Sequence, residues 1–241
     1  MIATYINSIV VVIGALIGLL IGTRLTDQFK QVVFASSGLV TLVIGIQMAM
    51  QTQSYLVLLF SIVVGGFAGY LLKIEDHILK LGDWMEKRTS KNGSKASEGS
   101  LFARGFLNAS VLFCSGAMAV VGSISAGTKG DYTLLLIKSV MDGAMAIIFA
   151  AAYGAGVIGS AVVILIYQGF FTLAGGYLSP LMGEAGLIEL SSAGGVLLIM
   201  IAFGLIQVKQ FKTGNFIPAL LFAPLFSKLG TYLVSVLPFF S

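Results

Sequence analysis

Apolar runs of about 20 residues recur along the whole chain, separated by short polar turns. A helix of that length crosses the ~30 Å hydrocarbon core of a bilayer. Charged residues make up 10% of the 241 residues and hydrophobic residues 57%, whereas a soluble domain carries about 25% charge. The chain therefore cannot cover itself with a hydrated surface, and the pattern predicts an all-α, polytopic membrane protein of about seven to eight transmembrane helices.

The apolar runs predict spans at about 3–22, 32–50, 55–72, 102–124, 132–153, 157–178 and 193–208. The first run is expected to be a retained span because no basic residues precede it. Residues 73–100 predict an amphipathic interfacial helix followed by a flexible linker. Residues 179–192 are expected to be a polar connection. The last stretch, 216–240, contains three prolines and fits either one kinked span or two half-helices.

Two parts of the chain resemble each other. Residues 1–72 and 101–178 each hold three predicted spans, 73–100 joins them, and 179–241 adds C-terminal helices. The matching pairs are Ile6-Asn7 with Leu107-Asn108, Gly14-Ala15 with Gly116-Ala117, Ser37-Gly38 with Asp142-Gly143, and 67–71 with 174–178. A unit with an odd number of spans enters the membrane from the opposite side when repeated, so we expect an inverted repeat, as in many transporters. Chance similarity between glycine-rich apolar sequences is the alternative.

The placement of lysine and arginine predicts the orientation. If the N-terminus is outside, the outer loops hold Lys129 alone, and Lys138 and Lys228 fall within spans. The inner side then holds Arg24, Lys30, Lys73, Lys80, Lys87, Arg88, Lys91, Lys95, Arg104, Lys209 and Lys212. This bias predicts an external N-terminus and a cytoplasmic 73–100 segment.

Lys138 and Asp142 stand out because the other apolar runs are nearly free of charge. Their spacing of four residues places them on one helical face, and the span 132–153 puts Asp142 near the midplane. A charge at that depth is expensive unless it faces protein or a water-filled cavity. We expect a site in which Asp142 binds a cation or proton and Lys138 attracts an anion. The alternative is a structural ion pair that ties helices together.

Other polar positions could take part in the same site. Small residues between Asn108 and Gly127 suggest a fourth span that is unwound or closely approached, although tight helix packing explains them too. Gln168 fits either a solute site or an interhelical hydrogen bond. Glu189 is expected either at the start of a helix or at the entrance to the site, and Asn215 is expected to be a helix N-cap. The predicted solute- or ion-binding residues are Lys138, Asp142, Asn108, Ser115, Gly116, Ser123, Ser125, Gln168, Glu189 and Asn215.

The composition also limits partners and chemistry. Gly14, Gly18 and Gly22 form a stripe on one helical face, which predicts a homodimer through these residues or ordinary packing within the chain. The expected partners are the lipid bilayer and a small polar solute or ion, and not nucleic acid. With a single cysteine, Cys114, and a single histidine, His77, we expect no internal disulfide, metal site, cofactor or catalytic centre.

Several stretches carry a resemblance to a known family. They are I-N-S near the start, C-S-G-A-M-A-V-V-G-S, K-S-V-M-D-G, Y-Q-G, E-L-S-S-A-G-G and N-F-I-P-A-L, in order along nearly the whole chain. The chain thereby resembles the domain of unknown function 554 family, the YqgA/YdfK-type bacterial inner-membrane proteins. In that family an Asp-Gly pair often follows G-S-I, where this chain has Ser125-Ala126-Gly127, so no carboxylate role carries over there. The resemblance implies an integral inner-membrane protein with a transporter-like helical fold, and no substrate.

Two functions fit these features. The first is a secondary transporter or permease for a small polar solute, with alternating access around the spans 102–124 and 132–153. The chain has no ATP-binding motif, so a gradient would drive such transport. The second is a non-transporting scaffold or sensor that acts through its cytoplasmic linker. An intramembrane enzyme is less well supported, because no nucleophile with a base is visible at useful spacing.

Overall fold

The structure, a computed structural model, describes residues 1–22, 26–89, 101–114 and 117–236, and every element in these ranges is a helix. The elements are α1 (Ile2–Gly22), α2 (Asp27–Ala49), α3 (Tyr55–Leu71), α4 (Ile74–Thr89), α5 (Leu101–Cys114), α6 (Ala117–Thr128), α7 (Thr133–Tyr153), α8 (Gly156–Leu205), the 3-10 turn η1 (Thr213–Phe216) and α9 (Ala219–Val236). The predicted all-α fold is confirmed.

Four helical segments of the described chain are long and apolar enough to cross a membrane: Ile2–Gly22, Thr133–Tyr153, Gly156–Tyr177 and Met182–Leu205. The number rises to six if two bent pairs each count as one span. These pairs are Tyr55–Leu71 with Ile74–Leu81, bent by 61°, and Leu101–Cys114 with Met118–Thr128, bent by 60°. In α2, the apolar helical segment Gly38–Ala49 is shorter than these spans. The larger number of seven to eight spans stays a prediction.

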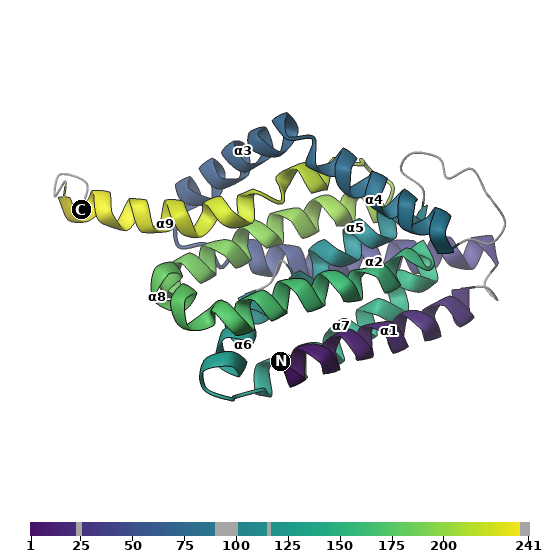
Figure 1. Ribbon diagram of the computed structural model, residues 1–241. Coiled ribbons are helices and arrows are strands. Elements are labelled where there is room, and N and C mark those ends of the chain that lie inside the picture. The colour runs from purple at the N-terminus through teal and green to yellow at the C-terminus, as the bar shows by residue number, and fades with distance from the viewer. Residues whose placement is uncertain (23–25, 90–100, 115–116, 237–241) are drawn as a thin grey trace.

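The glycine stripe of α1 packs against α7 of the same chain (Figure 1). A Cβ added at Gly14 or Gly18 would overlap the carbonyl oxygen of Gly143 or Ile147, and Gly22 lies against Ala151. Residue numbers rise along α1 and along α7 in the same direction at these contacts, so the two helices run parallel with their backbones close together. This stripe is therefore occupied within the chain, and a homodimer, which stays a prediction, would need another surface.

Two antiparallel pairs complete the bundle. In α2, Gly38 lies against Leu205 and Ile206, and Gly45 faces Gly195 near the other end of the second half of α8. The helix α3 lies beside η1 and α9 at the top of Figure 1. The helices α2 and α3 of the first predicted unit thus pack on the C-terminal helices, and α1 packs on α7 of the second unit. The inverted repeat stays a prediction, and the two units differ in shape, because α1 is continuous whereas its counterpart α5–α6 is bent.

The expected polar connection at 179–192 is shorter in the structure. The element α8 consists of two helices, Gly156–Tyr177 and Met182–Leu205, and the chain folds back between them at a kink where Gly183 has a φ of 65°, a conformation that suits glycine (Figure 1). The last apolar stretch, as far as it is described, is the single helix α9 with Pro224 inside it. Buried small residues such as Ser192 and Gly195 allow α8 to pack tightly against its neighbours, which favours helix over an exposed loop here.

Candidate functional site

The predicted charge pair is formed in the interior. Lys138 Nζ donates to Asp142 Oδ1 at 2.7 Å and to Oδ2 at 2.6 Å, within one face of α7. The two residues are only 7% and 6% exposed. Such a short bidentate contact offsets part of the cost of burying both charges.

Asn7 of α1 joins this pair across the α1–α7 interface. Its Nδ2 donates to Asp142 Oδ2 at 3.0 Å, and the residue is fully buried. Asp142 thus receives two bonds from Lys138 and one from Asn7. Since Lys138 and Asp142 both belong to α7, the bond from Asn7 is the one that ties this pair to α1. The geometry therefore fits both the binding site and the alternative of a structural ion pair between helices.

Two buried amides, one on α1 and one on α8, keep unused hydrogen-bonding atoms. Asn7 Oδ1 and both side-chain polar atoms of Gln168 have no hydrogen-bond partner among the described residues, although Gln168 is 0% exposed. Asn7 belongs to α1 and Gln168 to α8, two helices that also contact each other where Thr4 Oγ1 is 3.5 Å from Thr172 Oγ1 and Ser8 donates to the Ala161 carbonyl oxygen. A buried polar group without a partner costs about 1–3 kcal/mol, so these amides favour a bound ligand or water.

Both α5 and α6 contact α7, the helix that carries the pair. Cys114, the last residue of α5, is buried. Ser115 and Gly116 lie outside the described residues. The hydroxyl of Ser123 donates to the Ala119 carbonyl oxygen of its own helix at 2.5 Å. The Ser123 hydroxyl therefore makes its hydrogen bond within α6 and not to the charge pair.

Several other predicted residues lie away from the pair and make structural contacts. The backbone carbonyl of Ser125 accepts from Lys129 and Asp131 and thereby closes the end of α6. Glu189 is not at a helix start: it is 1% exposed inside α8. Its carboxylate accepts from Thr52 Oγ1 at 2.7 Å and from the next two backbone amides at 2.7 and 3.1 Å. It thus anchors the α2–α3 turn, because a buried carboxylate needs such donors.

The prediction that Asn215 caps the following helix is wrong. Asn215 lies within η1, and its Oδ1 accepts from the Glu75 backbone N–H at 2.9 Å, while Glu75 Oε2 accepts from the Gly214 N–H at 2.8 Å. The two bonds clamp η1 to the first turn of α4. The sequence could not reveal this because the partners are 140 residues apart.

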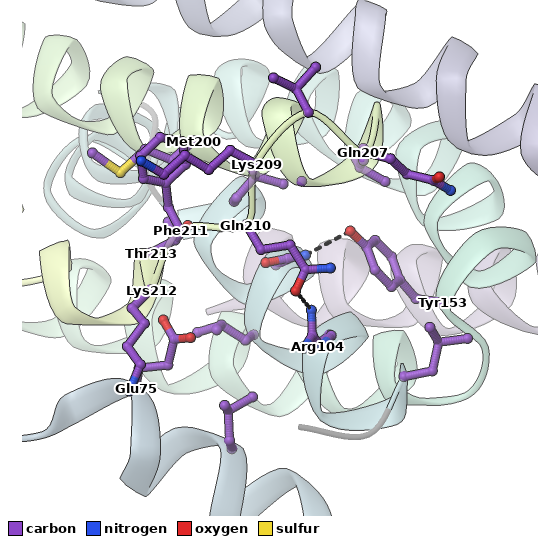
Figure 2. Close-up of a pocket in the computed structure, with 18 of the residues that line it drawn as sticks. Glu75, Arg104, Tyr153, Met200, Gln207, Lys209, Gln210, Phe211, Lys212 and Thr213 are labelled. Carbon is purple, nitrogen blue, oxygen red and sulfur yellow. Dashed lines mark hydrogen bonds between the residues drawn. The ribbon is translucent and has the colours of Figure 1, made fainter. Parts of the chain in front are cut away.

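Asn108 lines a cavity at the C-terminal end of α7. Its Nδ2 donates to Tyr153 Oη at 2.8 Å, and a volume of ≈1180 Å³ lies between α4, α5, the ends of α7 and α8, and the segment 207–213. Figure 2 shows Arg104, Gln210 and Tyr153 facing this space. Asn108 is therefore separated from Asp142 and belongs to a second polar region.

Comparison with known proteins supports the resemblance. The model of a family described as protein of unknown function DUF554 matches residues 2–228. The chain belongs to the DUF554 family. It is 26% identical over 228 residues to the uncharacterized membrane protein YdfK of Bacillus subtilis strain 168, covering 93% of this chain and 94% of YdfK. It is also 26% identical over 222 residues to the uncharacterized protein YqgA of Escherichia coli K12, covering 92% and 94%. No solved structure matches the chain.

Together with the apolar helices, the likeness to YdfK makes this DUF554 chain a multi-pass membrane protein. Sequence reasoning left Asn7 out of the candidate site, although its match to Asn108 marked both positions. It also treated Arg104, Lys209 and Lys212 only as topology signals. Nothing in their spacing indicates that the fold gathers them around one cavity.

Proposed function

We propose that this DUF554 protein is a secondary transporter for a small polar solute in the bacterial inner membrane, with its N-terminus outside. The solute would bind around Asp142, between α1, α7 and the bent α5–α6 pair. The observation that carries the proposal is the buried Lys138–Asp142 pair with Asn7 bonded across to it. Ionisable residues inside membrane proteins usually mark a path for solutes, ions or protons.

The local chemistry supports a polar solute. The pair is neutral as a whole, and the unpartnered amide atoms of Asn7 and Gln168 can donate and accept hydrogen bonds without a formal charge. A proton or cation at Asp142 would loosen its hold on Lys138, which frees an ammonium for an anionic group of the solute. That exchange would couple solute binding to an ion gradient, with no need for ATP.

The cavity supports access from one end. Asp142, Phe149 and Tyr153 follow one buried stripe of α7, and Tyr153 lines the cavity about 16 Å along the helix from Asp142. Phe149 is fully buried, and its ring centroid lies 5.7 Å from that of Tyr153. An apolar ring between two polar regions blocks water and ions. We propose that Phe149 closes the path here and moves aside during transport.

The test begins with a thermal-shift screen of the purified protein against organic acids, amino acids and Na⁺. Solutes that stabilise it are then offered to proteoliposomes holding wild type, Asp142→Asn or Asp131→Asn. Asp131 is a control of the same residue type: it is exposed, and a hydrogen bond from the Thr133 N–H lowers the pKa of its carboxyl. We expect Asp142→Asn to abolish uptake and Asp131→Asn to retain it.

Normal uptake by correctly folded Asp142→Asn protein would remove Asp142 from the mechanism. A scaffold that acts through its linker gives a different pattern. Deletion of residues 89–100 would then abolish the cellular phenotype, while Ala at Lys138 and Asp142 would be tolerated.

A further inference from the structure

The cavity beside Tyr153 is a second candidate site, separate from Asp142. Its ≈1180 Å³ would hold a ligand well beyond the size of a single ion. The lining comes from five parts of the chain, α4, α5, α7, α8 and the segment 207–213. A space assembled from so many elements has a defined shape, unlike a groove along one helix.

The charge of the lining is positive. It includes four cations, Lys80, Arg104, Lys209 and Lys212, and two carboxylates, Glu75 and Asp76, so the formal balance is 4 − 2 = +2. Both carboxylates are already engaged. Glu75 accepts from the Gly214 N–H at 2.8 Å, and Asp76 pairs with Lys212 at 3.3 Å.

The placement of the cations suits an oxyanion. The guanidinium of Arg104 points into the space and donates to Gln210 Oε1 (Figure 2). The ammonium of Lys209 lies 5.1 Å from the centroid of the Phe211 ring, a contact that leaves it accessible to an anion. An arginine fork with one or more lysines is the arrangement that binds phosphate through charge-assisted bonds.

The rest of the wall is partly apolar and partly uncharged polar. Met200, Ile201, Leu205 and Leu107 line the side toward the bundle. A ligand with a charged phosphate and an apolar or neutral remainder would match both parts of the wall. A phosphate group with a charge near −2 also balances the formal +2 of the lining.

We propose that this cavity binds a phosphate-bearing anion between Arg104, Lys209 and Lys212. The phosphate belongs either to a free solute or to the headgroup of an anionic lipid, since this end of the bundle is also the one expected to face the anionic cytoplasmic leaflet. The site does not depend on transport through Asp142.

The first test uses the full-length wild-type protein in detergent. Surface lysines are acylated with and without inorganic phosphate, at constant ionic strength set with chloride, and the labelled sites are read by mass spectrometry. We expect phosphate to protect Lys209 and Lys212 and to leave Lys129 unchanged. Lys129 is an exposed lysine just before α7, at the far end of that helix from the cavity.

The same labelling in nanodiscs separates the two sources. Protection by phosphate in solution indicates a free solute, whereas protection only in phosphatidylglycerol discs, compared with phosphatidylcholine discs, indicates a lipid headgroup. The Arg104→Gln and Lys209→Gln variants should each weaken the protecting ligand by about 10-fold or more, and Lys129→Gln should not. Absence of protection in both settings, or equal protection of Lys129, would overturn the proposal.

Discussion

Replacing Gln168 by leucine should make the protein more stable. The side chain is 0% exposed, and neither its Nε2 nor its Oε1 has a hydrogen-bond partner among the described residues. Leucine is of similar size and has no polar atoms, so the substitution removes the unsatisfied amide without opening a large cavity. A membrane protein under selection for stability alone would have no reason to keep glutamine here.

The size of the effect follows from the amide. An unsatisfied buried polar group costs about 1–3 kcal/mol. In a chain of this length each kcal/mol shifts the Tm by roughly 2–4 °C. We therefore expect the Tm of Gln168→Leu to rise by about 2–12 °C. If Gln168 serves the solute, as proposed, the more stable variant should also lose uptake, a trade-off typical of functional sites.

The assay is thermal unfolding of the purified protein in detergent, with Gln53→Leu as the control. Gln53 is exposed in the α2–α3 turn, so its side chain should tolerate the change with little shift in Tm. A Tm that falls in Gln168→Leu would refute the reasoning, because it would mean that the amide makes stabilising bonds in the folded protein. Unchanged uptake in a stabilised variant would separate Gln168 from the solute site.

Two further predictions concern packing and anchoring. Gly18→Ala should lower the free energy of unfolding by about 1–3 kcal/mol, and with it the Tm, because the added Cβ would overlap the Ile147 carbonyl oxygen. Gly176→Ala is its control and should leave the Tm unchanged, because no atom lies within 4 Å of the added Cβ. Glu189→Ala should cost about 2 kcal/mol or more, because it leaves the Thr52 hydroxyl and the Gln53 N–H without an acceptor and removes one of the two acceptors of the Ser54 N–H. The loss is measured by Tm and by faster hydrogen exchange in the α2–α3 turn. The exposed Glu184→Ala is its control, and an equal loss of stability in both glutamate variants would contradict the anchoring role.

The predicted helices agree with the structure where an apolar run ends in a clear polar turn. The runs at 3–22, 55–72 and 132–153 correspond closely to α1, α3 and α7. Agreement is partial at 179–192, where one proline, two glycines and two glutamates suggest a connection, but the second helix of α8 already begins at Met182. Glu189 can be buried in a helix there because its carboxylate accepts hydrogen bonds from the α2–α3 turn, more than 130 residues away in the sequence.

The sequence by itself determined that this chain is helical, lies in a membrane and carries one charge pair in an apolar helix. These properties follow from composition and periodicity, which act over one helix at a time. Only the tertiary structure decided that the glycine stripe of α1 packs against α7 and that Asn7 donates a hydrogen bond to Asp142. It also decided that Arg104 and Lys209 line the same cavity. Each of these contacts joins residues about 100 or more positions apart. Such contacts are set by how whole helices pack, and no local pattern records them.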